Sequence, residues 1–188
     1  PLGEYAGLKC EINEAVDCLK GTGPDDVTQL SVDLCANILV QSGMSTNKPE
    51  AKTLLMKNIE NGRALEKFEE MIVAQNGDLN DIYSKKNFAK NLIKIKSKKT
   101  GYIKSINTEK IGWALVEIGC GKKVISDTLD HSAGIKTIYK VGDKIHRGDT
   151  IYELFGFNET KLKNAKKMLT KTYIISEQKI EKKNLIIE

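Results

Sequence analysis

The stretch KVGDKIHRGDTIYEL at residues 140–154 predicts two β-strands joined by a turn. Its Gly-Asp pairs at 142–143 and 148–149 are typical of tight turns, because glycine and aspartate tolerate the required backbone angles. The side chains expected on the buried face of the strands are Val141, Ile145, Ile151 and Leu154. This segment therefore places β-structure at the centre of the second half of the chain.

The flanking sequence extends this pattern in both directions. Upstream, apolar residues alternate from Ala89 onwards, and a further β-segment reads GYIKSI at 101–106. Helical periodicity interrupts the strands at 109–118 and returns at 158–169. Closing strands are expected at 173–175 and 185–187. The second half is therefore predicted to be of the α+β class.

The first eighty residues have helical periodicity instead. Four helices are expected, at 11–19, from Gly-Pro-Asp-Asp at 23–26 to Gly43, from Ser45 or Thr46 to 60, and at 64–75. Pro24 suits a first helical position, and the two aspartates after it suit the positive end of the helix dipole. We therefore divide the chain into a helical layer at 1–80 and an α+β domain at 81–188.

The composition excludes several classes of protein. The chain has 188 residues, of which 40% are hydrophobic and 29% are charged, and its net charge is +5. No run approaches the roughly 18 consecutive apolar residues of a membrane span, and we expect neither a membrane partner nor a secretory leader. The four cysteines form no Cys-x-x-Cys pair and there are two histidines, which argues against a zinc site. A reduced, cytoplasmic protein with buried thiols is expected.

Lysines concentrate between Lys85 and Lys104, where eight of them accompany Phe88 and Tyr102. Basic residues interleaved with aromatic ones are typical of nucleic-acid binding. A solvated lysine-rich face explains the same pattern, and we prefer it, so no nucleic-acid partner is expected. Nucleic-acid binding through this segment stays the alternative.

Two motifs resemble catalytic or binding elements only superficially. Gly119-Cys-Gly-Lys-Lys lacks the Gly-Lys-Ser/Thr of a phosphate loop, so a tight turn is the better interpretation. Asp127 and Asp130 lie close to His131, but no nucleophile elbow surrounds the neighbouring serines. Capping and turn formation are preferred for these residues. A hard cation would suit the loop at 2–7 together with Glu14, but from the residues alone a solvated glutamate is the preferred interpretation.

Three blocks of sequence together resemble one enzyme family. The blocks are PLG at 1–3 with Gly7, EINEAV and LKGTGPDD in 11–26; NGRALEKFEEMIVAQNGD at 61–78; and GYI, IGCGK, DTLDHSAG, VGD and GD between 101 and 149. In this order they resemble the C-terminal part of the pyrimidine-nucleoside and thymidine phosphorylases. Leu8 stands where the family usually has asparagine, and Lys122 where it usually has arginine.

The resemblance implies a fold and an activity. Residues 1–80 would be helices from the large phosphorylase domain, and residues 81–188 an α/β-hammerhead domain. The intact enzyme would cleave pyrimidine nucleosides with phosphate as co-substrate. Its catalytic and substrate-binding residues would lie outside this chain, so none is assigned here. The resemblance does not separate thymidine from uridine as substrate.

The resemblance also implies a metal site and an oligomeric state. Relatives bind K⁺ or a Ca²⁺-like cation through two loop carbonyls and a glutamate, which correspond to Leu2, Tyr5 and Glu14. The full-length enzyme would be a homodimer through a small helical domain, and this part alone a monomer. A carrier module of the biotin or lipoate type is a second possibility for the hammerhead, but the expected Met-Lys pair between two strands is missing.

Overall fold

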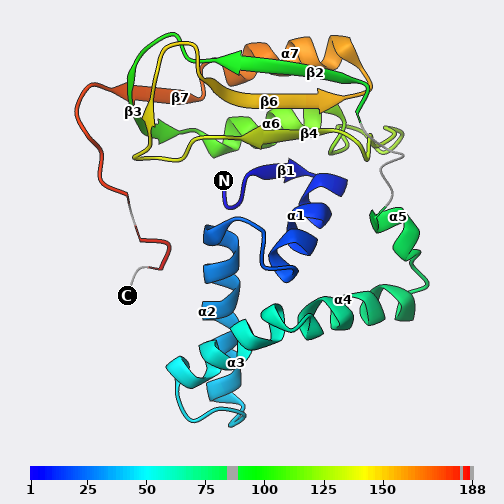
Figure 1. The fold of residues 1–188 in the computed structure, drawn as a ribbon. Helices are drawn as coiled ribbons and strands as arrows, with labels where there is room; N and C mark the ends of the chain where they lie inside the picture. The colour runs from blue at the N-terminus through cyan, green and yellow to red at the C-terminus, as the bar shows by residue number, and fades with distance from the viewer. Residues whose placement is uncertain (84–88, 183, 187–188) are drawn as a thin grey trace. The chain divides into compact units, whose positions relative to one another are not determined.

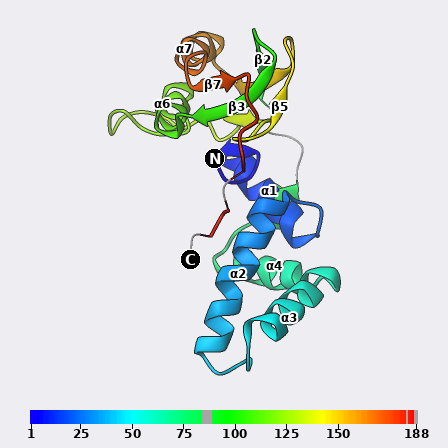
Figure 2. The same cartoon turned by 90° about the vertical axis from the view of Figure 1, so that its left-hand side faces the viewer.

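The computed structural model describes residues 1–83, 89–182 and 184–186. The chain divides into two units (Figures 1 and 2). The sheet unit comprises Pro1, Gly3–Glu11 and Lys85–Asn184, and the helical unit comprises Leu2, Ile12–Ser84 and Leu185–Glu188. This division differs from a boundary at residue 80, because the first residues of the chain cluster with the sheets. The mixture of helices and antiparallel sheets confirms the α+β class.

The four helices predicted before residue 80 are present. They are α1 (Lys9–Leu19), α2 (Asp25–Gln41), α3 (Lys48–Glu60) and α4 (Arg63–Ala74), and a short fifth helix that the sequence did not predict follows as α5 (Leu79–Tyr83). The start of α3 was predicted wrongly: Asn47, rather than Ser45 or Thr46, caps it by accepting a 3.0 Å hydrogen bond from the Glu50 amide. Pro24 is the residue before α2 rather than its first residue.

In the described part of the chain, seven short strands form two antiparallel sheets. The four-stranded sheet has the order β1 (Tyr5–Gly7), β4 (Gly134–Thr137), β6 (Thr150–Gly156) and β2 (Asn91–Lys96). The three-stranded sheet has the order β5 (Lys144–Ile145), β3 (Gly101–Ile106) and β7 (Tyr173–Ser176). The predicted strand–turn–strand unit is present, but its two strands, β5 and β6, belong to different sheets. No strand forms at 184–186, and residue 187 of the predicted closing strand lies outside the described residues.

Two helices complete the sheet unit, namely α6 (Thr108–Ile118) and α7 (Glu159–Leu169). Both begin after an asparagine whose side chain accepts a backbone N–H, as N-cap residues do. The two helices contact each other, and their apolar faces join those of the strands in one core. The fully buried members of this core include Ile103, Ile135, Ile145, Tyr152, Leu154, Leu162 and Leu169. Among the described residues, no helix has the length and apolar character needed to cross a bilayer.

Candidate functional site

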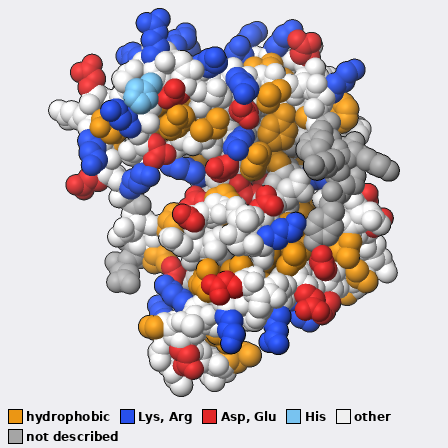
Figure 3. Space-filling view, viewed as in Figure 1, with side chains coloured by type: hydrophobic (Ala, Val, Ile, Leu, Met, Phe, Trp, Pro, Cys, Tyr) orange, Lys and Arg blue, Asp and Glu red, His pale blue; other side chains and the backbone are white. Residues whose placement is uncertain are grey.

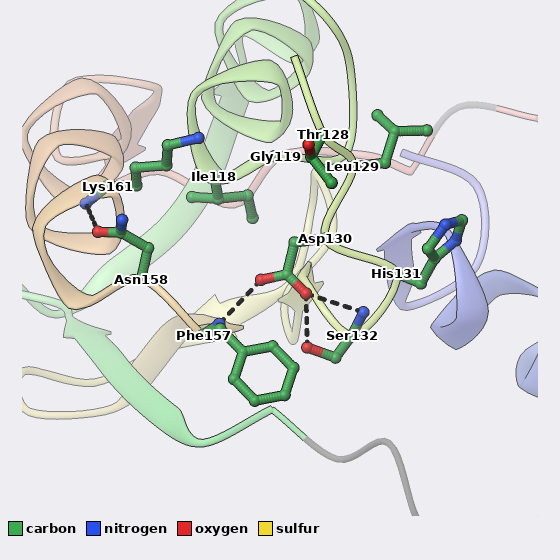
Figure 4. Close-up of a pocket in the computed structure, with 10 residues that line it drawn as sticks. All are labelled: Ile118, Gly119, Thr128, Leu129, Asp130, His131, Ser132, Phe157, Asn158 and Lys161. Carbon is green, nitrogen blue, oxygen red and sulfur yellow. Dashed lines mark hydrogen bonds between the residues drawn. The ribbon is translucent and has the colours of Figure 1, made fainter. Parts of the chain in front are cut away.

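A pocket of about 450 Å³ lies in the sheet unit beside the end of α6 and the start of α7 (Figure 4). The loop at 128–132 forms one wall, and Phe157, Asn158 and Lys161 lie opposite it. This pocket contains Asp130 and His131, the two neighbours that the sequence singled out.

Asp130 holds two loops together. Its carboxylate accepts hydrogen bonds from the Ser132 amide (3.0 Å), the Ser132 hydroxyl (2.7 Å) and the Phe157 amide (2.8 Å). The imidazole of His131 points away from it (Figure 4). A carboxylate occupied by three donors, one of them 27 residues away, anchors a loop and does not orient the histidine as a general base. The interpretation of these residues as turn-forming is confirmed.

The loop beginning at Gly119 caps the C-terminal end of α6. Gly119 has a φ of 103°, which is the left-handed conformation that glycine adopts at helix ends. Phosphate loops use the N–H groups at a helix N-terminus, whereas this end of α6 presents carbonyls. The preferred interpretation of this motif as a tight turn is therefore confirmed.

The two lysines of this motif have partners inside the same region. Lys122 Nζ lies 3.3 Å from the Ile125 carbonyl, and Lys123 pairs with Glu117. Asp127 accepts hydrogen bonds from two backbone amides of the loop, and these lower the pKa of its carboxyl. Its role is that of a turn residue, as expected.

The three predicted cation ligands occupy different elements. Leu2 precedes Gly3 in the N-terminal loop, Tyr5 begins β1 opposite Lys136, and Glu14 is buried in α1. A buried carboxylate and a loop rich in carbonyl groups fit the hard-cation chemistry. Within the described residues, no group of three or more His, Cys, Asp or Glu side chains is arranged to hold a metal. A shared site stays a prediction.

Lys140 makes long-range contacts with the N-terminal loop that the sequence did not predict. Its ammonium donates to the carbonyls of Pro1, at 2.5 Å, and Gly3. The amide of Thr137 also donates to the Glu4 carbonyl, at 2.7 Å. These contacts attach the N-terminal loop to the β4 region, and no local motif announces them because the partners are more than 130 residues apart.

The cysteines have no disulfide, and they differ in environment. Burial is the main cause that raises the pKa of Cys10 to about 11 and that of Cys120 to about 12. Such thiols carry little thiolate at neutral pH and are poor nucleophiles. The expectation of buried thiols was wrong for Cys35, which is exposed, and the other three are half-buried.

Two alternatives involve lysines, namely nucleic-acid binding through Lys85–Lys104 and a carrier lysine for biotin or lipoate. Lys85, Lys86 and Phe88 lie outside the described residues. Lys98 and Lys99 lie in the turn between β2 and β3, and both are exposed. The turn between β5 and β6 reads His146-Arg147-Gly148-Asp149. It offers no lysine for biotin or lipoate.

Residues 102–176, which contain most of β3 and all of α6, β4 to β6, α7 and β7, match the family described as the pyrimidine nucleoside phosphorylase C-terminal domain. This match defines the class of protein to which the sheet unit belongs. The same region holds the pocket, the α6 cap and the Asp130 anchor.

Similarity to curated proteins extends over the rest of the chain. A pyrimidine-nucleoside phosphorylase of Geobacillus stearothermophilus is 30% identical across 100% of this chain. Those of Staphylococcus aureus (strain bovine RF122 / ET3-1) and Staphylococcus epidermidis are 36% identical across 80% of it. The chain spans only 44% and 35% of the lengths of these relatives. It belongs to the pyrimidine-nucleoside phosphorylase family, as a C-terminal part.

Proposed function

We propose that this chain is the C-terminal part of an enzyme that cleaves pyrimidine nucleosides with phosphate. A phosphate oxygen would attack the anomeric carbon, the C–N bond would break, and its electron pair would leave with the base. The products would be the free base and the sugar 1-phosphate. The names of the relatives and the match at residues 102–176 support this activity.

The chain itself is proposed to support the phosphate-side lobe without supplying reacting groups. The observation that carries this proposal is the apolar surface of the helical unit. Its buried hydrophobic residues are Val16, Val32, Ala36 and Ala51. Large apolar side chains are exposed on the helices α1 to α4, namely Ile12, Leu34, Ile38, Leu54, Met56, Met71 and Val73. Orange side chains mark such positions on the helical unit in Figure 3.

Leu34 and Ile38 form the part of this apolar surface that lies on α2. They are 55% and 62% exposed, and they lie one turn apart on the same face of α2. Adjacent exposed apolar residues are typical of a surface that another polypeptide covers. The relatives contain more than half of their length beyond the matched part, and we propose that the corresponding polypeptide covers this face.

An activity assay tests the proposal directly. The chain alone, incubated with phosphate and uridine or thymidine, is expected to release no more free base than a blank without protein. The Geobacillus relative serves as the positive control. Adding its N-terminal portion as a separate polypeptide is expected to restore phosphorolysis. Enzyme-like turnover by the chain alone would refute a supporting role.

Substitutions on α2 connect activity with the apolar face. Leu34→Ser with Ile38→Ser is expected to lower binding of a hydrophobic dye and to block restoration of activity by the added portion. Because both residues are exposed, the unfolding midpoint should change little. Ile125→Ser is the control, since Ile125 is 96% exposed but belongs to the sheet unit. Equal effects of both variants would contradict the assignment.

We further propose that the chain alone is a monomer, that it works in the cytoplasm, and that Leu2, Tyr5 and Glu14 bind a cation such as K⁺. Sedimentation tests the first point, and a tight dimer would contradict it. Thermal melting in KCl, CaCl₂ and choline chloride tests the cation. Stabilisation by K⁺ or Ca²⁺ that disappears in Glu14→Gln supports the site, and identical melting in all three salts removes it.

A further inference from the structure

Positive charge is concentrated on two segments of the sheet unit. Residues 94–104 and 144–150 together contain seven Lys or Arg and one Asp, whereas the whole chain contains 30 Lys plus Arg and 25 Asp plus Glu. The two segments are far apart in sequence. Their enrichment is therefore meaningful only if the fold brings them together.

The backbone does bring them together. The Ser97 amide donates to the Asp149 carbonyl at 2.8 Å, and the Gly148 amide donates to the Ser97 carbonyl at 2.9 Å. The Arg147 amide donates to the Thr100 hydroxyl oxygen at 3.0 Å. These bonds fix the β2–β3 turn against the β5–β6 turn. We call this end of the unit the basic tip and define it by Lys96, Lys98, Lys99, Lys144 and Arg147.

The charges of the basic tip are available to a partner. All five side chains are exposed, and none forms an ion pair with another described residue. The acid within the tip is already occupied, because the Asp149 carboxylate accepts a hydrogen bond from the His146 amide at 2.8 Å and one from the Tyr139 hydroxyl at 3.1 Å. In the space-filling view, Lys and Arg side chains gather along this edge of the unit (Figure 3).

An aromatic side chain lies beside one of these charges. Tyr102 of β3 is directly opposite Lys144 of β5, so their side chains share one face of the three-stranded sheet. Tyr102 is partly exposed there. A tyrosine beside lysines offers a surface on which a base can stack while the lysines contact phosphates. The lysines of α7 form another basic surface, but α7 contains no aromatic residue.

We propose that the basic tip, with Tyr102, binds single-stranded nucleic acid. The stacking surface favours a nucleic acid over an acidic protein. The two turns also present no large apolar side chain for insertion into a membrane. This inference goes beyond the proposed phosphorolysis and does not depend on it.

Fluorescence anisotropy with a labelled oligoadenylate of about twelve nucleotides tests the proposal. This probe contains no pyrimidine nucleoside, so its binding is independent of the proposed activity. For single strands, the logarithm of the binding constant falls with log salt by about 0.7 per neutralised phosphate, so five cations predict a slope of down to about −3.5. Lys98→Gln with Lys99→Gln removes two of these cations and should make the salt slope shallower by about 1.4.

Two further variants make the test specific. Lys166→Gln with Lys167→Gln removes the same charge from α7 and should leave the slope unchanged. Tyr102→Leu should weaken binding about tenfold without changing the slope, because stacking releases no counterions. Urea unfolding followed by Trp113 fluorescence checks that each variant is folded.

In the titrations of the chain and its variants, four results would overturn the proposal. The first is that the probe does not bind at low salt, and the second is that the Lys98→Gln, Lys99→Gln variant has the same salt slope as the original chain. The third is that the Lys166→Gln, Lys167→Gln variant makes the salt slope shallower by the same amount, and the fourth is that Tyr102→Leu binds the probe as tightly as the original chain. Displacement of the probe by polyglutamate at matched charge would assign the tip to acidic proteins instead, and would equally refute nucleic-acid binding.

Discussion

Thr137 carries an unsatisfied polar group in the core of the sheet unit. The residue is 1% exposed in β4, on the same face as the fully buried Ile135. Its hydroxyl oxygen has no hydrogen-bond partner among the described residues. A buried hydroxyl without a partner costs about 1–3 kcal/mol. Thr137→Val replaces that hydroxyl with a methyl group in the same place, and we expect it to stabilise the unit by about 1 kcal/mol.

The chain contains a matched control for this substitution. Thr172 is also buried, but its hydroxyl donates to the Leu169 carbonyl at 2.7 Å and lies 3.0 Å from the Tyr152 hydroxyl. Thr172→Val leaves the Tyr152 hydroxyl without this partner in a fully buried position. We therefore expect a loss of about 1–2 kcal/mol from the same chemical change.

Urea unfolding followed by Trp113 fluorescence measures both effects. The chain has one tryptophan, and it lies in α6, so its signal reports on the sheet unit. With a slope of about 1–2 kcal/mol per molar urea, the Thr137→Val midpoint should rise by roughly 0.5–1 M. A fall in that midpoint, or shifts of the same sign in both variants, would refute the reasoning about the unpaired hydroxyl.

Three further predictions follow from single contacts. Gly134→Ala should destabilise the sheet unit by about 2 kcal/mol, because a Cβ there would lie 2.6 Å from the Phe155 ring; an unchanged urea midpoint would contradict it. Cys35 should be alkylated before Cys10 at pH 8, because Cys35 is exposed whereas burial raises the pKa of Cys10 to about 11. Mass spectrometry gives the order of labelling, and faster labelling of Cys10 would refute the prediction. A hydrogen bond from Lys123 lowers the pKa of Glu117 below its value in the unfolded chain, so the stabilisation from this carboxylate is full above the unfolded pKa and is lost as pH falls through the folded pKa. Glu117→Gln should therefore reduce the loss of stability below about pH 4.5. Unfolding midpoints at acid pH that are the same in the variant and the original chain would contradict this prediction.

The helices were predictable because their signals are local. Apolar spacing and the stop residues after 19, 41 and 118 depend only on neighbouring positions, and each helix that was predicted ends within about two residues of its prediction. The N-cap residue of α3 was harder to predict, because Ser45, Thr46 and Asn47 are all suitable cap residues. Which of them caps the helix depends on the geometry of the turn.

Strand pairing could not be predicted in the same way. The turn residues at 148–149 indicate that the chain reverses, but they do not say that β5 and β6 enter different sheets. The three residues of β1 are too few to show alternation, and their partner β4 lies more than 120 residues away. The role of Asp130 was predicted as structural, but its bond to the Phe157 amide required the fold.

The two units differ in how fully they enclose apolar surface, and this difference bears on function. Fourteen described residues form the buried core of the sheet unit, and they are seven isoleucines, three leucines, three alanines and Tyr152. Among its described residues, the helical unit buries four hydrophobic side chains, two of which are alanines. Burial of a large aliphatic side chain contributes about 1.5–3 kcal/mol, so the helices obtain little stability from their own contacts. Helices in proteins depend on tertiary packing of an apolar face, and the exposed face around Leu34 and Ile38 shows where that packing is missing. The proposed supporting role predicts this difference, because it needs a sheet unit with its own core and helices whose apolar face another polypeptide covers.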